Sequence, residues 1–332
     1  MRQATDLLLF CILVFLNTLY KEAEAQVCGV VPTSCPPETD EYRTFTGECN
    51  NKIYPWYGTI YSEYDNTTQL NVGYGPQSMP RAKSGKPLPN PREIREKCLP
   101  DDLQFQQEPY TTRSFSGYAQ FLAHDMSSAF FASTYISSFH IKVRLNLITR
   151  STAYLDLNIV YGNSIEESNS LRVPNSYLLA FESYKGTPFP PNDPTNSFCP
   201  YSTETTCFIG GDLRMNQNPD LTIEHIIWFR FHNYLATSLK IINPKWTNET
   251  IWQEARKINI GVFQWIIFNE VLPVVLGRSN MYDNNLLFET FYYLYVDDYD
   301  PYCSPNILNE FATAAFRVFH PYIKGQLGHS VE

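Results

Sequence analysis

The sequence predicts a mainly α-helical fold that begins with a long irregular segment. Two long stretches after residue 219 carry apolar side chains every three to four positions, which is the pattern of helices with one buried face. Strand-like and helix-like segments do not alternate along the chain, so a parallel α/β sheet is not expected. The 332 residues, 43% apolar and 18% charged, suffice for one large or two ordinary domains and exclude a disordered chain.

Residues 1–25 have the pattern of a secretory signal peptide. A basic residue, Arg2, precedes the apolar run Leu7–Leu16, and Ala23 and Ala25 supply the small residues of a cleavage site. The alternative, a membrane anchor, is disfavoured because the run is far shorter than the ~20 residues that a span requires. No later segment is expected to span the membrane, so we expect a secreted, soluble protein.

Charge and cysteine content restrict the class further. A formal charge of −9 disfavours a nucleic-acid-binding protein. Because no C-x-x-C pair occurs, a zinc or thioredoxin-like site has little support. Of the eight cysteines, Cys11 lies in the signal, and one of the remaining seven is free, intermolecular or without its partner. Local disulfides are expected for Cys35–Cys49 and Cys199–Cys207, and glycosylation sequons stand at Asn66 and Asn248.

The expected elements before residue 162 are one helix and two irregular stretches. Residues 26–109 are dense in Pro, Gly, Asn and Tyr and are expected to wrap irregularly, with a turn at Asn90–Pro91. A helix is expected over 114–131, where apolar residues recur at helical spacing. Residues 143–161 mix short β-like runs with polar positions and are interpreted as loop. The apolar residues of the first helix are Tyr118, Phe121, Leu122 and Met126.

Three further helices are expected. The first spans 219–242, with Asp220 near its start and Asn243-Pro244 at its end, where proline prevents continuation. The second spans 250–268 and presents one apolar face. A shorter helix is expected from 304 to 320.

His124 and Asp125 are adjacent on the first expected helix. Adjacent helical residues point about 100° apart, so this pair would serve two different sites, one on each side of the helix. The alternative, a polar pair on the helix surface, is favoured by the residues alone. His225 and His232 lack a carboxylate partner at metal-ligand spacing and are interpreted as structural.

Oxygen-bearing side chains occupy alternate positions from Thr152 to Asn158. Calcium takes six to eight oxygen ligands, which an extended loop of this kind can supply. A half-buried strand is an equally good interpretation, and an EF-hand is excluded because its glycine and final glutamate are absent. Arg214, after Gly210-Gly211, is either a cation positioned in a pocket or an ordinary loop arginine. His320, on an apolar helix, is either a ligand or, more commonly, a core residue.

Taken together, these segments resemble the animal haem peroxidase family. The matching runs are Ala119–Asp125 (AQFLAHD), Tyr154–Gly162 (YLDLNIVYG), Gly211–Arg214, Arg230–Asn233, Asn243–Trp246, Gln253–Lys257, Leu272–Gly277 and Phe316–His320. Upstream, Tyr42–Asn51 and Ser84–Pro89 are similar to the peroxinectin and chorion-peroxidase branch. The resemblance extends from about Cys28 to Gly325, in family order, and implies a haem-peroxidase-like helical domain over 26–332.

The resemblance implies a role for each candidate residue. His124 would be the distal histidine, Arg214 the distal arginine, and Gln120 a neighbour in the same cavity. His320 would bind the haem iron on the proximal side, with Arg317 also contacting the cofactor. Calcium would be bound by Asp125, Thr152, Tyr154, Asp156 and Asn158, so that the ion would fix the helix that carries the distal histidine.

Two departures from the family pattern concern haem attachment and length. Ala123 and Gln217 replace the two ester-forming carboxylates, and Asn218 replaces the linking methionine of the myeloid enzyme. Noncovalent haem b is therefore expected. The chain ends twelve residues after His320, whereas the family continues, so a domain incomplete on its C-terminal side is expected, in which Cys303 lacks its partner.

The expected function is that of a secreted haem peroxidase in the response to oxidative stress. Hydrogen peroxide would oxidise small donors such as phenols, tyrosyl groups or halides. The alternative is a catalytically impaired, truncated product that acts as an extracellular binding or adhesion module. An extracellular-matrix or cell-surface partner fits either expectation.

Overall fold

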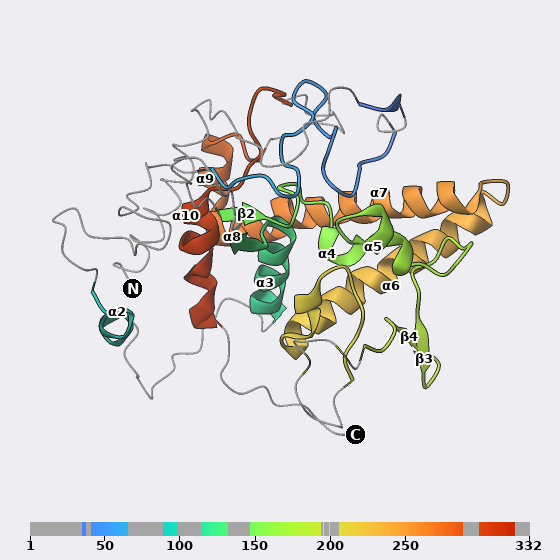
Figure 1. The fold of residues 1–332 in the computed structure, drawn as a ribbon, viewed down its shortest axis with the longest axis horizontal. Coiled ribbons are helices and arrows are strands. Elements are labelled where there is room, and N and C mark those ends of the chain that lie inside the picture. Colours follow the sequence, from blue (N-terminus) through green and yellow to red (C-terminus); the bar gives the residue numbers. More distant parts are fainter. Residues whose placement is uncertain are drawn as a thin grey trace, which may run out of the picture.

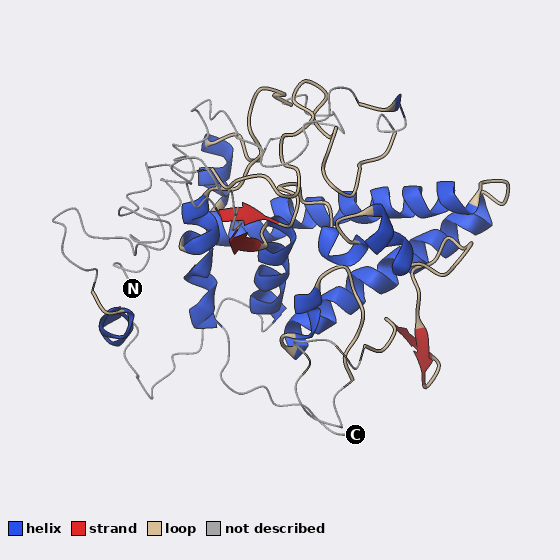
Figure 2. Ribbon diagram, viewed as in Figure 1, coloured by secondary structure: helices blue, strands red, loops and turns tan. Residues whose placement is uncertain are grey.

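The structure is a computed structural model that describes residues 35–37, 41–65, 89–98, 114–131, 147–193, 195, 199, 206–287 and 299–322. The expected signal peptide, Cys28 and the sequon at Asn66 lie outside the described residues. Helices dominate, and the strands form two small antiparallel pairs (Figures 1 and 2). The elements are α2 (Pro91–Cys98), α3 (Ser114–Met126), β1 (Ala129–Phe131), β2 (Leu147–Thr149), α4 (Asn158–Tyr161), α5 (Ile165–Ser170), β3 (Glu182–Tyr184), β4 (Thr187–Phe189), η2 (Leu213–Asn216), α6 (Pro219–Ile242), α7 (Asn248–Ile266), η3 (Ile267–Val271), α8 (Leu272–Leu276), α9 (Arg278–Asp283), α10 (Asn309–Thr313) and η4 (Ala315–Tyr322).

The two long helices α6 and α7 pack against each other, and α3 packs against α6 (Figure 1). Helix α6 has the predicted bounds because Asn218 caps it, accepting from the Leu221 amide at 2.9 Å, and Pro219 occupies its first turn. Aromatic side chains fill the junction: the Phe263 ring lies 5.8 Å from Phe121 and 5.2 Å from Trp228. The mainly α-helical fold predicted from periodicity is confirmed.

Three local predictions were wrong in detail. The first helix ends at Met126 instead of continuing to 131, because residues 129–131 pair with 147–149 as β1 and β2. That pairing and the short helix α4 also give structure to the stretch predicted as loop. Asn90–Pro91 begins α2 rather than a turn, since Asn90 Oδ1 accepts from the Arg92 amide at 2.9 Å and proline suits the first helical position.

The predicted helix over 304–320 is also interrupted. Its first residues pair with the N-terminal segment instead: the Asn309 amide donates to the Asp65 carbonyl at 2.7 Å, and the Asp65 amide donates to the Ile307 carbonyl at 3.1 Å. Helix α10 therefore begins at Asn309, and a break at Ala314, with φ −131° and ψ −62°, separates it from η4.

Both predicted disulfides, Cys35–Cys49 and Cys199–Cys207, are present. Within the described part of the chain, Cys303 is a free and exposed thiol. The continuous helical stretch Asn248–Leu276 is long and apolar enough to cross a membrane by length and composition alone. Its α7 part buries Ile251, Trp252 and Phe263 completely, whereas Trp265 and Val274 are 57% and 61% exposed.

Candidate functional site

Arg214, on η2, is held across the C-terminal end of α3. Its Nε donates to both oxygens of Asp212 at 2.9 Å, and Nη2 forms a further short ion pair with that carboxylate. Nη1 donates to the Ser127 carbonyl at 3.0 Å and Nη2 to the His124 carbonyl at 3.2 Å. Carbonyls at a helix end lack intrahelical partners, so Arg214 both satisfies them and fixes its own position. Arg214 is thus a positioned cation and not an ordinary loop arginine.

The His124 side chain is uncharged at neutral pH. Burial, followed by the nearby charge of Arg214, lowers the pKa of His124 to about 3. Its Nδ1 atom is buried and has no hydrogen-bond partner among the described residues. A neutral imidazole with an unpaired nitrogen can accept a proton from a molecule beside it.

Gln120, one turn before His124, belongs to a group of three amide side chains. Gln120 Nε2 donates to Gln217 Oε1 at 2.9 Å, and Asn218 Nδ2 donates to Gln120 Oε1 at 2.7 Å. Two of the positions expected to differ from the family, 217 and 218, therefore contact the residue expected in the distal cavity. No carboxylate belongs to this group.

The side of α3 that carries Asp125 faces a buried, oxygen-rich loop. Asp125, Thr152, Asp156 and Asn158 are each at most 3% exposed. Thr152 Oγ1 donates to Asp156 Oδ2 at 2.8 Å, and Asn158 Nδ2 donates to the Asp125 carbonyl at 2.6 Å. Asp125 Oδ1 and Asn158 Oδ1 are buried without a hydrogen-bond partner among the described residues.

Negative charge is unfavourable on the two carboxyl groups that meet here, that of Asp125 on α3 and that of Asp156 in the loop. Burial, followed by the charge of Asp156, raises the pKa of Asp125 well above its ordinary value, and burial also raises the pKa of Asp156. The described residues contain no cluster of three or more His, Cys, Asp or Glu side chains. A cation here would instead take two carboxylates with hydroxyl, amide and carbonyl oxygens, which is the donor set that calcium prefers.

Tyr154 belongs to the loop but differs from the expectation for its side chain. The Tyr154 hydroxyl donates to the Tyr57 carbonyl at 2.8 Å, away from the carboxylates, whereas its backbone carbonyl accepts from Thr152 Oγ1 at 3.3 Å. Only that carbonyl is therefore placed to contribute to the oxygen-rich group.

A buried arginine that sequence reasoning missed stands beside the loop. Arg256 of α7 is 3% exposed, and its Nη1 donates to the Arg43 carbonyl at 2.7 Å. Its charge acts to lower the pKa of Asp156, against the effect of burial. The usable signal was helical spacing: Arg256 lies four residues after Trp252 and four before Ile260, both buried, and residues four apart share one face of a helix.

His124 and Asp125 thus point to different groups, as the 100° separation predicts. The favoured alternative, a polar pair on the helix surface, was wrong: Asp125 is completely buried, and His124 interacts electrostatically with Arg214 and Asp212. The strand interpretation of residues 152–158 was also wrong, because this segment is an irregular loop that ends in α4.

The element with His320 packs beside α3 (Figure 1). The rings of Phe115 and Phe319 meet edge to face at 5.7 Å. Arg317 lies close enough to affect the pKa of His124. His320 itself is exposed, so the alternative of a satisfied core histidine was wrong. The structure brings His124, Arg214 and the oxygen-rich loop together around α3 and places His320 on the neighbouring η4.

The two histidines interpreted as structural are buried in α6. His232 is completely buried, with Nδ1 3.0 Å from the Tyr161 hydroxyl, and burial lowers its pKa to about 3. His225 is 2% exposed, and its Nε2 has no partner among the described residues. Only His232 has the hydrogen bonds of an ordinary core histidine.

Comparisons with known proteins point to one family of sequences and to one fold. The sequence model of the animal haem peroxidase family matches residues 42–142 and 129–330. A peroxidase of Drosophila melanogaster is 30% identical over 90% of this chain and 51% of its own length. The chorion peroxidase of Aedes aegypti is 27% identical over 89% of this chain and 44% of its own length. Among solved structures, peroxidase A of Dictyostelium discoideum aligns with a TM-score of 0.64 at 23% identity, over 84% of this chain and 59% of that chain. The chain spans about half the length of these curated relatives.

Proposed function

The chain belongs to the animal haem peroxidase family, and from this membership we propose that it is a secreted haem peroxidase that uses hydrogen peroxide to oxidise small donors. Phenols, tyrosyl groups and halide ions are the donor classes proposed. The observation that carries the proposal is the proximity of a neutral histidine and a fixed arginine: the charge of Arg214 helps to lower the pKa of His124, and Arg214 Nη2 donates to the His124 backbone carbonyl at 3.2 Å.

The residues on and beside α3 fit a haem group. Haem carries carboxylate side chains, for which Arg317 would supply a cation, and its iron takes an imidazole ligand, for which exposed His320 is available. Bound haem would supply the iron redox chemistry that acts on peroxide. Attachment would be noncovalent, because Ala123 has no carboxyl group and the Gln217 amide is hydrogen-bonded to Gln120.

His124 and Arg214 would divide the work on peroxide between them. The neutral His124 imidazole would take a proton from one peroxide oxygen and return it to the other. The low pKa of His124 favours the return step, since the protonated ring is a strong acid. Arg214, held by Asp212, would stabilise negative charge on the departing oxygen.

Calcium would complete the oxygen-rich loop. The ligands proposed are the side chains of Asp125, Thr152, Asp156 and Asn158 with the Tyr154 carbonyl. A divalent cation would pair with the two unpartnered oxygens and remove the repulsion between the two buried carboxylates. Because Asp125 follows His124 on α3, the bound ion would also hold the distal histidine in position.

A second candidate function is a catalytically impaired binding module. Helix α6 exposes a row of apolar side chains, between 50% and 77% exposed, and an exposed apolar surface is typical of contact with another polypeptide. The row consists of Ile223, Ile227, Tyr234 and Ile241.

One experiment separates the two functions. The full chain is expressed in a secretory host with haem and calcium, and its Soret absorbance and peroxide-dependent guaiacol oxidation are measured. The peroxidase proposal expects both signals, with His320→Ala losing the Soret band and His124→Leu keeping the band but losing turnover. Thr313→Ala, exposed on α10, is the control. A folded, secreted product without haem would refute the proposal and favour the binding module. A mature N-terminus at Gln26 would establish cleavage of the signal.

A further inference from the structure

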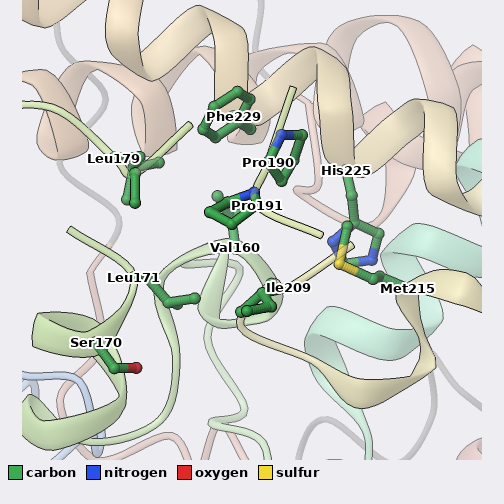
Figure 3. A pocket seen from close by; sticks show the side chains of 12 residues that line it. Val160, Ser170, Leu171, Leu179, Pro190, Pro191, Ile209, Met215, His225 and Phe229 are labelled. Carbon is green, nitrogen blue, oxygen red and sulfur yellow. The ribbon is translucent and has the colours of Figure 1, made fainter. Parts of the chain in front are cut away.

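A small cavity lies between the segment that carries Arg214 and helix α6. It is partly enclosed and has a volume of about 50 Å³. Exposed Ser170 and Ile209, the latter 39% exposed, mark its outer side, whereas Met215, His225 and Phe229 form its buried side. Figure 3 shows Met215 and His225 at one side of the lining and Ser170 at the other. A cavity of this size admits water or a molecule of two to four heavy atoms.

His225 contributes the unpaired polar atom of this cavity. The residue is 2% exposed, and its Nε2 has no hydrogen-bond partner among the described residues. Phe121 packs against the ring edge to face, with centroids 4.9 Å apart, which fixes its orientation. The ring is neutral because burial lowers the pKa of His225 to about 4. A buried nitrogen without a partner is costly, so a small hydrogen-bonding guest would be stabilised here.

Met215 presents an oxidisable sulfur to the same cavity. Its side chain is 1% exposed, and the sulfur lies directly against Gly210, where a Cβ would overlap it. The Met215 carbonyl accepts from Thr222 Oγ1 at 2.7 Å, which ties this residue to α6. Because Met215 follows Arg214, any change in the packing of the sulfur acts directly on the segment that positions the arginine.

We propose that this cavity admits hydrogen peroxide to Met215, which is thereby a specific oxidation site beside the distal arginine. One peroxide oxygen is transferred to the thioether sulfur, which loses two electrons, while the O–O bond breaks and the other oxygen leaves as water. The new sulfoxide oxygen would accept a hydrogen bond from His225 in its Nε2–H form. This reaction needs no haem and is distinct from the peroxidase activity proposed above.

The consequence of oxidation would be local. Conversion of an apolar thioether into a polar, larger sulfoxide disrupts tight packing, and no space remains on the Gly210 side. The segment 209–216 would shift, and with it the hydrogen bonds from Arg214 to the end of α3. Peroxide would thus act on the protein independently of its use as a substrate.

The test compares methionines in the folded full chain. The protein is treated with hydrogen peroxide under native conditions without haem, and sulfoxide at each methionine is quantified by peptide mass spectrometry over time. Met215 is expected to oxidise at least about tenfold faster than Met281, which is equally buried and lines no part of this cavity. Ile209→Trp, which would fill the outer side, should slow Met215 oxidation severalfold. Leu213→Trp, at an exposed position of the same segment, should not slow it.

The unfolding temperature supplies a second measurement. Peroxide treatment should lower the unfolding temperature of the wild-type protein but not that of the Met215→Leu protein. Equal oxidation rates for Met215 and Met281 in the wild-type protein would by themselves overturn the proposal. Unchanged Met215 oxidation in a folded Ile209→Trp protein would also overturn it, because access would then come from opening of the segment. None of these outcomes depends on whether the protein turns over a donor.

Discussion

Replacing Asp125 by asparagine should abolish stabilisation by calcium while leaving the loop folded. Asp125 Oδ2 accepts from the Leu157 amide at 3.3 Å, and asparagine retains an oxygen for that bond. Its amide group would replace the unpartnered Oδ1. Because burial and the charge of Asp156 already raise the pKa of Asp125, the neutral side chain should be as stable as the wild type, or more stable, when calcium is removed.

The size of the effect follows from linkage. Calcium at 100 to 1,000 times its dissociation constant stabilises the folded state by about 2.7–4.1 kcal/mol. For a chain of 332 residues, each kcal/mol corresponds to roughly 1.4 °C, so removal of calcium from the wild type should lower the unfolding temperature by roughly 4–6 °C. The Asp125→Asn protein should show a shift close to zero.

The assay is thermal unfolding, followed by intrinsic fluorescence, in calcium and in EGTA. Magnesium serves as the competing ion and should restore little, because it prefers a rigid octahedral site with several waters. Asp283→Asn, at an exposed position on α9, is the matched control and should respond to calcium as the wild type does. An equal response to EGTA in the wild type and Asp125→Asn would refute the assignment of this loop as a calcium site.

The remaining predictions concern Arg214, His232 and the haem linkage. Arg214→Gln should lower kcat for peroxide-dependent guaiacol oxidation about 10²–10³-fold with an unchanged Soret band; a loss confined to KM would contradict its charge-stabilising role. Between pH 6.5 and 5 the unfolded chain protonates His232 while the folded chain, with a pKa of about 3, does not. Stability should therefore fall as the pH drops, by roughly 2 kcal/mol from this residue. His232→Asn should remove that part of the pH dependence in urea unfolding at pH 8 and pH 5, and an unchanged dependence would show the reasoning to be wrong. Acid–acetone should extract all haem from the holoprotein, as measured by the pyridine haemochrome assay, and haem that stays with the protein would indicate a covalent bond.

The features that could be predicted from the sequence rest on signals within a few residues of one another. Asn218-Pro219 and Asn243-Pro244 bound α6 through local capping and the missing proline N–H, so the predicted bounds agree with the structure. The two short cysteine loops are also local, and both disulfides are present. The divergence of His124 and Asp125 follows from the geometry of any helix.

The features that only the tertiary structure decided depend on contacts between distant segments. Residues 304–308 were predicted to begin a helix, yet hydrogen bonds between Asp65 and residues 307 and 309 hold this segment in a non-helical conformation. Tyr154 was expected to offer oxygen to calcium, but its hydroxyl has a partner in residue 57, leaving only the carbonyl.

Which charged and polar side chains are removed from water was also decided only by the tertiary structure. Arg256 is enclosed beside Asp156 because the N-terminal segment, through Arg43, lies over α7, and the cavity at Met215 forms where separate segments meet α6. The sequence identifies the charged groups and sulfur atoms of these residues. The packing of segments far apart in the chain determines which of these groups remain in contact with water and which are buried and need a partner inside the protein, because desolvation depends on everything that surrounds a group.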